Sequence, residues 1–384
     1  MIRIDLHGGF GEKGRTSLGV SNGDTRILFD VGIKVGAAGD EYYPLIDDAK
    51  IERLDAVFIS HAHEDHIGGL AWLSSRGFKG RIFMTRETLT DAPAMLAQYG
   101  DPSHLANFSL PDQQVRIFFP GDRIQLGSLA IETGRSAHVV GGVWFRISDD
   151  DRKIVYTADV VPDSNVLAMD PIPPCDLLVF DASYGDDPVS GQERAEAIRN
   201  WTGANGKASL LPVPLAGKPL ELMAILPDGF AVHADMRRAI EAQILQADAL
   251  LPGVAERLRR RLAAAPDWKD EDTFPECPLL TFDGMGAAGP SATAIRRADA
   301  ENIPILLTGH IPPNTPASEL YARGRASWIR LPTHPTLSGA IGIWETAGRP
   351  SAIGHSCDLA SIDKLSHHIP TVQRSVKTGD HVIL

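Results

Sequence analysis

Short apolar runs bounded by glycine and aspartate recur along the first half of the chain. Runs rich in Val, Ile and Phe, about four to eight residues long and ended by turn residues, are typical of buried strands. The sequence therefore predicts strands within residues 25–32, 55–63, 81–85, 129–134, 143–148, 153–159 and 176–185. A helical pattern over residues 88–100 lies between two of these runs. We expect this half to form layered sheets flanked by helices.

After Gly185 strand-like runs alternate with longer helical patterns. Strands are predicted within residues 207–215, 231–234, 278–286 and 303–310, and helices within 218–226, 235–251 and 291–301. This alternation predicts a parallel sheet with crossover helices. Residues 252–277 are charged and contain proline, so we expect a surface excursion there. The runs 340–346, 351–358 and 381–384 are expected to return to short strands.

Composition places the chain among ordinary globular proteins. Of its 384 residues, 43% are hydrophobic and 22% are charged, which excludes a disordered chain, a fibre and a coiled coil. No run approaches the ~20 apolar residues of a membrane-spanning helix, and the N-terminus lacks the layout of a secretion signal. Three distant cysteines indicate no disulfide framework, so the cytoplasm is the expected compartment. The net charge of −12 argues against indiscriminate nucleic-acid coating but leaves room for a local basic groove.

The densest group of metal-ligating side chains lies in SHAHEDHIGG, residues 60–69. It places His61, His63, Asp65 and His66 within six residues, directly after the apolar run AVFI. Imidazoles and a carboxylate suit Zn²⁺ and also accept Mn²⁺ or Fe. These ligands exceed what one open site needs, so the pattern predicts two adjacent ions. The plain alternative is a solvated polar loop in which this spacing of four ligand-type residues is a coincidence.

HAHEDH resembles the HxHxDH signature of the metallo-β-lactamase superfamily, and further motifs of the chain are similar to that family. Asp30, at the end of ILFD, matches an acid that orients the metal-binding loop from behind. His138 in SAHVVGG matches a metal ligand, and Asp159 in YTAD matches the carboxylate that bridges the two ions. The resemblance implies that one ion is held by His61, His63 and His138, and the other by Asp65 and His66, with Asp159 shared.

Segments of the second half resemble the β-CASP branch of that superfamily, which includes ribonuclease J and the mRNA 3′-end-processing endonucleases. DLLVFDASYG resembles a strand that ends in an acid, and KASLLPVPLAGKPLELMAIL resembles a strand-then-helix segment in which Lys218 and Leu220 replace the usual arginine and glutamine. GHSCDLASIDKL resembles the element whose histidine falls on His355. The resemblance implies an α/β fold, a metallo-β-lactamase αββα sandwich with an inserted β-CASP-like domain. The implied division is 1–190 for the first part of the sandwich domain, 191–345 for the insertion and 346–384 for the return.

The chain departs from the family at its last metal ligand, a histidine in a Val-His-Gly-acid turn near the C-terminus. The matching stretch SVKTGDHVIL has Lys377 or Thr378 in that position. His381 lies close by, beyond Gly379, and is a candidate substitute. Loss of this ligand would weaken the second ion or leave it bound through water.

Asp181 and His355 resemble the acid and histidine that complete the chemistry of the β-CASP branch. A carboxylate bonded to an imidazole fixes its tautomer and raises its pKa, which suits the ring to protonate a leaving oxygen. Asp65, Asp181 and His355 are therefore the residues expected to act in the reaction. The alternative is that Asp181 and His355 are structural polar residues at strand ends. His310 lies in LLTGHIPPNTPASELYARG, which resembles a Gly-Tyr element of that branch with the histidine in place of the usual tyrosine. The roles of His310 and His334 stay open, and either could line the cleft.

Weaker signals concern phosphate and backbone contacts. Three hydroxyls are candidates for binding phosphate, with helix N-caps as the plain alternative: Ser183, Ser291 and Thr315. Three arginines near the expected hinge between domains could contact a nucleic-acid backbone: Arg323, Arg325 and Arg330. A further cluster is expected to be a solvated helix face: Arg257, Arg259, Arg260 and Arg261.

Three functions from different classes follow from these residues. The favoured one is a metal-dependent hydrolase, a β-CASP-type ribonuclease that cleaves RNA phosphodiester bonds with a metal-activated water and two divalent ions, with zinc first and manganese as the alternative. The second is a metallohydrolase of a small ester, lactone or phosphodiester on the same scaffold. The third is a non-catalytic partner that binds RNA or a related nuclease, against which the intact ligand motifs speak. No membrane partner is expected, and a homodimer rests on the family resemblance alone.

Overall fold

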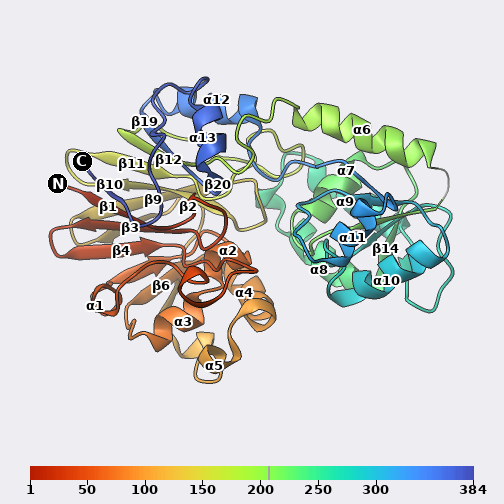
Figure 1. Ribbon diagram of the computed structural model, residues 1–384, viewed down its shortest axis with the longest axis horizontal. Helices are drawn as coiled ribbons and strands as arrows, with labels where there is room; N and C mark the ends of the chain where they lie inside the picture. The colour runs from red at the N-terminus through yellow and green to blue at the C-terminus, as the bar shows by residue number, and fades with distance from the viewer. Residues whose placement is uncertain (206–207) are drawn as a thin grey trace. The chain divides into compact units, whose positions relative to one another are not determined.

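The computed structural model describes residues 1–205 and 208–384, which divide into two compact units (Figure 1). Unit 1 comprises Met1–Pro162, Met169–Pro188 and His334–Leu384. Unit 2 comprises Asp163–Ala168 and Val189–Thr333. Both ends of the chain therefore belong to unit 1, and most of unit 2 is inserted into it as a single stretch.

The first sheet of unit 1 has seven strands in the order β21-β1-β3-β4-β5-β6-β7. Strands β21, β1, β3 and β4 pair antiparallel, whereas β4, β5, β6 and β7 pair parallel. Their bounds are β1 Arg3–Gly8, β3 Ser17–Asn22, β4 Thr25–Phe29, β5 Ala56–Phe58, β6 Arg81–Met84, β7 Val115–Ile117 and β21 His381–Ile383. The backbone N–H of Ile2 donates to the carbonyl oxygen of Leu384 at 3.1 Å, so the two termini lie side by side, as Figure 1 shows.

The second sheet of unit 1 has six strands in the order β19-β12-β11-β10-β9-β8. Strands β8 to β11 form an antiparallel meander, and β11, β12 and β19 are parallel. Their bounds are β8 Arg123–Leu126, β9 Leu129–Arg135, β10 Val143–Ser148, β11 Lys153–Tyr156, β12 Leu177–Asp181 and β19 Ser351–His355. A separate short pair joins β2 (Phe10–Gly11) to β20 (Cys357–Asp358).

Alternating side chains assign the two faces of each sheet in unit 1. Phe29 and Phe58 of the first sheet meet Phe145 and Tyr156 of the second in the core between the sheets. Leu28, next to Phe29, points to the opposite face, as the two-residue period of a strand requires. Helices cover both outer faces: α1 (Asp48–Ile51), α3 (Leu70–Ser75) and α4 (Arg86–Tyr99) on the first sheet, α12 (Leu337–Thr346) and α13 (Leu359–Leu365) on the second (Figure 1). This confirms the predicted αββα sandwich.

Unit 2 is built on a parallel sheet in the order β15-β14-β16-β13-β17-β18. Its strands are β13 Ser209–Pro212, β14 Ala231–His233, β15 Asp267–Trp268, β16 Pro278–Thr281, β17 Ile305–Leu307 and β18 Ala326–Trp328. Its helices are α6 Gly191–Ala204, α7 Lys218–Ile225, α8 Ala234–Leu245, α9 Val254–Ala264, α10 Gly289–Ala300 and α11 Pro316–Ala322. The predicted parallel sheet with crossover helices is therefore present, although Lys207, at the start of one predicted strand, lies outside the described residues.

Residues 252–277, expected as a surface excursion, instead contain α9 and the edge strand β15. Helix α9 exposes most of its charged side chains but buries three apolar ones at a spacing of four: Val254, Leu258 and Leu262. That spacing places them on one helix face, which packs into unit 2. The prediction was wrong because the charged residues of the exposed face hid this narrow apolar stripe.

Residues 340–346, expected as a strand, lie in helix α12. The helix buries Ala340, Ile343 and Trp344, whose spacing of three and four residues matches a helical turn. Short apolar runs cannot be assigned to helix or strand from periodicity alone, which explains the error. The helix covers the second sheet and so stabilises the strands that carry the site described below.

Two expectations from composition bear on the chain's environment. Within residues 1–205 and 208–384, no helix is both long and apolar enough to cross a membrane. The three cysteines are free thiols, and Cys357 is buried.

Candidate metal centre

The predicted ligands of unit 1 follow strands of both sheets. The HAHEDH residues follow β5, Asp30 follows β4, His138 follows β9 and Asp159 follows β11. The backbone turns sharply at these positions, because four non-glycine residues at or beside them have φ between 47° and 61°: Asp30, Ala137, Ala158 and Ser356. Such left-handed conformations cost about 1–3 kcal/mol each and persist only where the surrounding structure enforces them.

The loop that carries HAHEDH is packed tightly against Thr16 and Gly32. The backbone N–H of Thr16 donates to the carbonyl oxygen of Asp65 at 2.9 Å. A Cβ atom on Gly32 would lie 1.8 Å from that same oxygen, so only glycine fits there. His63 occupies the N-cap position of the short helix α2 (Glu64–Ile67), which turns Asp65 and His66 back toward the preceding histidines.

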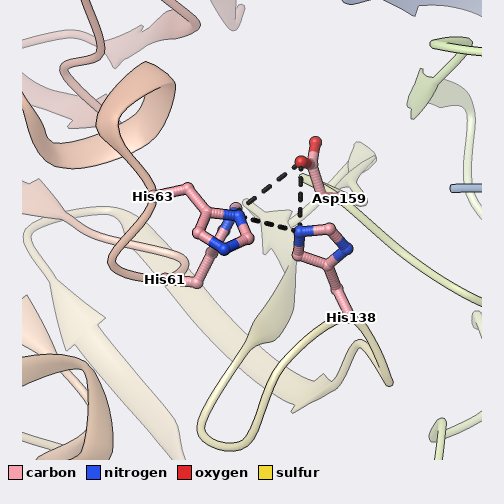
Figure 2. Close-up of side chains that lie close together, drawn as sticks. All are labelled: His61, His63, His138 and Asp159. Carbon is pink, nitrogen blue, oxygen red and sulfur yellow. Dashed lines mark hydrogen bonds and ion pairs between the residues drawn. The ribbon is translucent and has the colours of Figure 1, made fainter. Parts of the chain in front are cut away.

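Three imidazoles and one carboxylate converge in what we call the first ligand group, His61, His63, His138 and Asp159 (Figure 2). The Nδ1 atom of His63 lies 3.1 Å from Nε2 of His61 and 3.0 Å from Nε2 of His138. The Oδ2 atom of Asp159 lies 3.8 Å from Nε2 of His61 and 3.5 Å from Nε2 of His138. All four ligand atoms lie within 4.8 Å of one another, which is the spacing of donors around one small cation.

The second ligand group consists of Asp65, His66 and Asp159. Nε2 of His66 lies 3.2 Å from Oδ1 of Asp159 and 3.8 Å from Oδ2 of Asp65. Asp159 therefore turns one oxygen toward each group, as a bridging carboxylate would. The side chain of Asp65 is 32% exposed, whereas Asp159 and His66 are buried.

Asp30 orients the rings from behind. Its buried carboxylate accepts hydrogen bonds from the backbone N–H and the hydroxyl of Ser60, from Nδ1 of His66 and from the hydroxyl of Tyr156, all at 2.7–2.8 Å. Because the Ser60 hydroxyl donates to Asp30, its oxygen is left to accept from Nδ1 of His61 at 3.0 Å. This network assigns the Nδ1–H tautomer to both His61 and His66, so that their Nε2 lone pairs face the two ligand groups.

Buried atoms without partners test whether the centre fits metal ions. Within the described part of the chain, Nε2 of His66, Oδ1 of Asp159 and Nε2 of His355 are buried and have no hydrogen-bond partner. Burying such atoms without a partner is costly, and native proteins rarely leave them so. A cation between His66 and Asp159 would satisfy both atoms. The donor set therefore fits divalent metal ions.

Burial and neighbouring charges shift the pKa values of these groups in opposite directions. Burial lowers the pKa of His138 to about 3, and burial with the nearby His66 lowers the pKa of His61 well below its usual value. Burial alone would raise the pKa of Asp159, but His66 and His334 outweigh it and hold that pKa well below its usual range. Neutral imidazoles and an ionised carboxylate are the forms that bind metal.

The structure places Asp181 and His355 on adjacent parallel strands but does not hydrogen-bond them to each other. Their backbones are paired in the register of β12 and β19. Among the described residues, the Asp181 carboxylate bonds Nδ1 of His334 at 2.8 Å, while Nδ1 of His355 lies 3.0 Å from the Ser356 hydroxyl. The expected pairing is thus replaced by Asp181 with His334. Sequence reasoning left His334 unassigned because it belongs to no motif, and its only local signal is the flanking Pro332 and Pro335.

The C-terminal segment does not supply the missing ligand. His381 is exposed in edge strand β21, where it pairs with Asp5, and it joins neither ligand group. The Thr378 hydroxyl donates to Glu12 at 2.7 Å, and Lys377 is exposed. Within the described residues, the second ligand group therefore has no histidine from the C-terminus.

The candidate phosphate contacts are occupied within the fold. Ser291 is buried and its hydroxyl is bonded to that of Thr281 at 2.7 Å. Thr315 caps α11, and the Ser183 hydroxyl donates to Asp181 at 2.6 Å. The plain alternative of a cap therefore holds for Thr315, and Ser291 is inaccessible.

The candidate backbone-contacting arginines also have partners. Arg323 and Arg325 both form ion pairs with Asp299, at 2.9 and 2.8 Å. Arg330 lies over the ring of Trp328, 5.1 Å from its centroid. On α9, Arg259 and Arg260 are 50% and 74% exposed, as expected for a solvated helix face.

Comparison with known proteins adds to this geometry. A model of the beta-lactamase superfamily domain matches residues 25–244. Transcription termination factor FttA of Cenarchaeum symbiosum is 30% identical over 307 residues, which are 71% of this chain and 46% of that protein. Endoribonuclease YSH1 of Yarrowia lipolytica is 23% identical over 358 residues, which are 82% of this chain and 43% of that protein. The chain thus spans somewhat less than half the length of these two relatives.

One solved structure shares the fold across its whole length. The crystal structure of a protein of unknown function from Enterococcus faecalis V583 aligns over 100% of both chains with a TM-score of 0.63. Its sequence is only 13% identical, so the likeness concerns the fold alone.

Proposed function

Because the chain belongs to the metallo-β-lactamase superfamily, we propose that it is a divalent-metal-dependent hydrolase that cleaves phosphodiester bonds of RNA. The observation that carries the proposal is the convergence of six ligand residues that follow strands of both sheets of unit 1, with Nε2 of His66 and Oδ1 of Asp159 buried and left without a hydrogen-bond partner. The RNA substrate is supported by the relatives, one of which is named an endoribonuclease.

In this proposal each ligand group holds one ion. His61, His63 and His138 would hold the first, Asp65 and His66 would hold the second, and Asp159 would be shared between them. Zinc suits the nitrogen-rich first group best, and manganese is the alternative for the second. When bound, such ions act as Lewis acids toward phosphoryl oxygens and make water a nucleophile at neutral pH.

The chain's own side chains have distinct tasks. Asp30 holds His61 and His66 in the tautomer that presents Nε2, and Asp159 keeps the two groups at a fixed separation. Asp65 is the most exposed ligand carboxylate and so the one best placed to meet water or substrate. Asp181 is assigned the task of positioning the ring of His334, whose Nδ1 it bonds. His355 is entirely buried, and its Nε2 has no hydrogen-bond partner among the described residues, so we keep it as a candidate residue of the centre.

The proposal includes the identity of the two units. Unit 1 is the metallo-β-lactamase domain, and unit 2 is the β-CASP-like insertion, which its place between β12 and α12 and its parallel sheet support. The free thiols of Cys175, Cys277 and Cys357 support a reducing compartment such as the cytoplasm.

Metal analysis of the purified protein combined with a cleavage assay tests the function. The substrates are a labelled single-stranded RNA, a DNA of the same sequence and a small aryl ester. We expect about two equivalents of metal and RNA cleavage that stops with chelator and returns with added zinc or manganese. Intact RNA with metal-dependent hydrolysis of the ester would replace the ribonuclease by a small-molecule metallohydrolase. RNA that is bound but never cut would indicate a non-catalytic binder.

A further inference from the structure

A cavity outside the metal centre gathers positive charge on helix α9 of unit 2. The cavity, which we call the α9 cavity, has a volume of about 380 Å³ and lies between that helix and the loop 228–230. Residues of its helical wall follow the spacing i, i+3, i+4 and i+7, which places them on one helix face: Arg257, Arg260, Arg261 and Ala264. Three arginines and Asp228 give the lining a net charge of +2, in a chain whose net charge is −12.

Arg261 is fixed in the wall of this cavity. Its Nη2 donates to the carbonyl oxygens of Leu226 and Pro227 at 2.7 and 2.9 Å. Its Nη1 lies 2.8 Å from Oδ1 of Asp228, and the guanidinium lies over the ring of Phe230, 5.5 Å from the centroid. In the part of the chain that the structure describes, Nε of Arg261 is buried and has no partner. The fold therefore holds a cation in place here and leaves one of its N–H groups unused.

Arg257 and Arg260 are exposed and are not held by the fold. Arg257 forms no hydrogen bond or ion pair with any residue of 1–205 and 208–384. Nε of Arg260, whose side chain is 74% exposed, lies 3.9 Å from Oε1 of Glu256, which is too long for a hydrogen bond. Glu256 is instead bonded to Arg259 at 3.3 Å, outside the cavity lining. Two guanidinium groups three residues apart on one helix face can therefore bind an anion together.

The lining indicates that the anion is a phosphate within a longer molecule. A guanidinium presents parallel N–H donors whose spacing matches two phosphate oxygens. Cavities that enclose a whole organic molecule are mostly apolar. Here the aromatic ring of the lining, Phe230, is 1% exposed and lies beneath Arg261, so it offers no surface to a base or another organic group. RNA carries such a phosphate at every nucleotide, and phosphate contacts supply most of its affinity for proteins that bind any sequence.

We propose that the α9 cavity is a second RNA-binding site, in which Arg257 and Arg260 bind one backbone phosphate beside the fixed charge of Arg261. The lining residues belong to neither ligand group and lie outside the motifs that carry the family resemblance. A phosphate carries no base information, so the site binds RNA of any sequence. This inference rests on the proposed ribonuclease function and adds to it a substrate contact outside the metal centre.

Steady-state cleavage by the double variant Arg257→Gln/Arg260→Gln tests the site in the metal-bound protein. Both side chains are exposed, so melting temperature and metal content should equal those of the wild type. We expect KM for single-stranded RNA to rise about tenfold with kcat unchanged, because substrate and transition state make this contact equally.

A matched control removes the same charge elsewhere on unit 2. Arg259→Gln/Arg296→Gln replaces two exposed arginines that do not line the cavity. Its KM should stay within about twofold of the wild type, since neither side chain contacts the proposed phosphate. A rise in KM equal to that of the cavity variant would overturn the proposal and leave only a general effect of charge.

The salt dependence of binding identifies the phosphate. Anisotropy of labelled RNA with chelator-treated protein gives the fall of log affinity with log salt concentration. This fall should be less steep by about 0.7 in the cavity variant, the value for one phosphate contact with a single strand. A DNA of the same sequence should lose affinity by the same factor. An unchanged slope, or a loss seen with RNA alone, would overturn the phosphate contact.

Titration with inorganic phosphate distinguishes RNA from a free ion. The same chelator-treated proteins are used, so that the metal centre does not bind the ion. Phosphate that binds the wild type but not the cavity variant, together with equal RNA affinity of the two proteins, would overturn the RNA assignment and make the cavity a site for a free anion.

The failures of the two proposals are distinguishable. Wild-type protein that neither binds nor cleaves RNA removes the proposed function and this inference with it. Wild-type cleavage that Arg257→Gln/Arg260→Gln leaves unchanged in KM, with an unchanged salt slope, removes this inference alone.

Discussion

Units 1 and 2 both bury charged side chains, but they surround them differently. In unit 1 acids and histidines converge, and Nε2 of His66, Oδ1 of Asp159 and Nε2 of His355 have no hydrogen-bond partner among the described residues. In unit 2, Lys218 is buried and Glu221 is partly buried on helix α7, and each meets a neutral group. The Lys218 ammonium donates to the carbonyl oxygen of Thr308 at 3.1 Å, and Glu221 accepts from the Ser164 hydroxyl.

This difference distinguishes a functional site from buried charged groups that only lower the stability of the fold. Burial lowers the pKa of Lys218 to about 8, with Arg330 adding to the effect, and raises the pKa of Glu221 to about 7. Neither has an opposite charge within ion-pair distance in the described residues. A converging set of perturbed groups indicates function, whereas a single perturbed group next to neutral partners mainly reduces stability.

The largest effect is expected from the first ligand group. His63→Ala removes the ring whose Nδ1 lies about 3 Å from two other ligand nitrogens. Metal ions supply several kcal/mol of transition-state stabilisation, so RNA cleavage should fall by about 10³-fold or more, with loss of at least one metal equivalent. Cleavage within about tenfold of the wild type at full metal content would contradict the assignment.

A smaller loss is expected from the second ligand group, which lacks the family's last histidine. Asp65→Asn replaces a partly exposed carboxylate by a neutral amide. We expect the protein to keep one metal equivalent, to bind the second more weakly and to lose about 10- to 100-fold in cleavage, partly recovered at high metal concentration. Metal titration followed by cleavage measures this, and equal losses of both ions would erase the distinction between the groups.

The pH dependence of the free energy of unfolding should show separate contributions from Lys218 and Glu221 of unit 2. The pKa of Lys218 is about 8 in the folded state, against an ordinary value of 10.5. Between pH 8 and 10.5 the unfolded chain therefore binds a proton that the folded protein has lost, so the free energy of unfolding rises with pH in this range. Glu221 has a pKa of about 7 against 4.5, so stability falls as pH rises from 4.5 to 7. Lys218→Met and Glu221→Gln should each remove one slope and raise the free energy of unfolding at pH 7.5 by roughly 1–3 kcal/mol.

Denaturant unfolding across pH 4.5–10.5 measures both slopes. The two variants serve as controls for each other, because each should leave the other's slope in place. A wild-type profile that both variants reproduce would mean that Lys218 and Glu221 are not the groups responsible.

The smallest effect is expected at the C-terminus. His381 is exposed and lies in β21, away from both ligand groups. His381→Ala should therefore change neither metal content nor cleavage by more than about twofold. Loss of the second ion in this variant would show that the C-terminal strand does complete the second ligand group.

Much of the fold and the four ligands of the HAHEDH loop could be predicted from local sequence, whereas His138 and Asp159 were assigned through the family resemblance. The HAHEDH loop follows an apolar strand and holds four ligands within six residues, so a single turn brings them together. Strands β4, β5, β6 and β9 to β12 could be predicted because their apolar residues are bounded by turn residues, whereas β1, β3, β7 and β8 were not predicted. Helices α9 and α12 were missed because one has a narrow apolar stripe and the other a short apolar run that fits either period.

Other features depend on residues that only the tertiary structure brings together. The tautomers of His61 and His66 depend on Asp30, whose carboxylate also meets Tyr156, 126 positions away. His334 reaches Asp181 across 153 positions.

The amino-acid sequence by itself determined which side chains could bind metal and their spacing within each loop, because both are local properties of the chain. Only the packing of distant strands decided which lone pairs are filled, which ring faces solvent and which histidine pairs with Asp181. A hydrogen bond depends on positions in space, and these are not a local property of the chain.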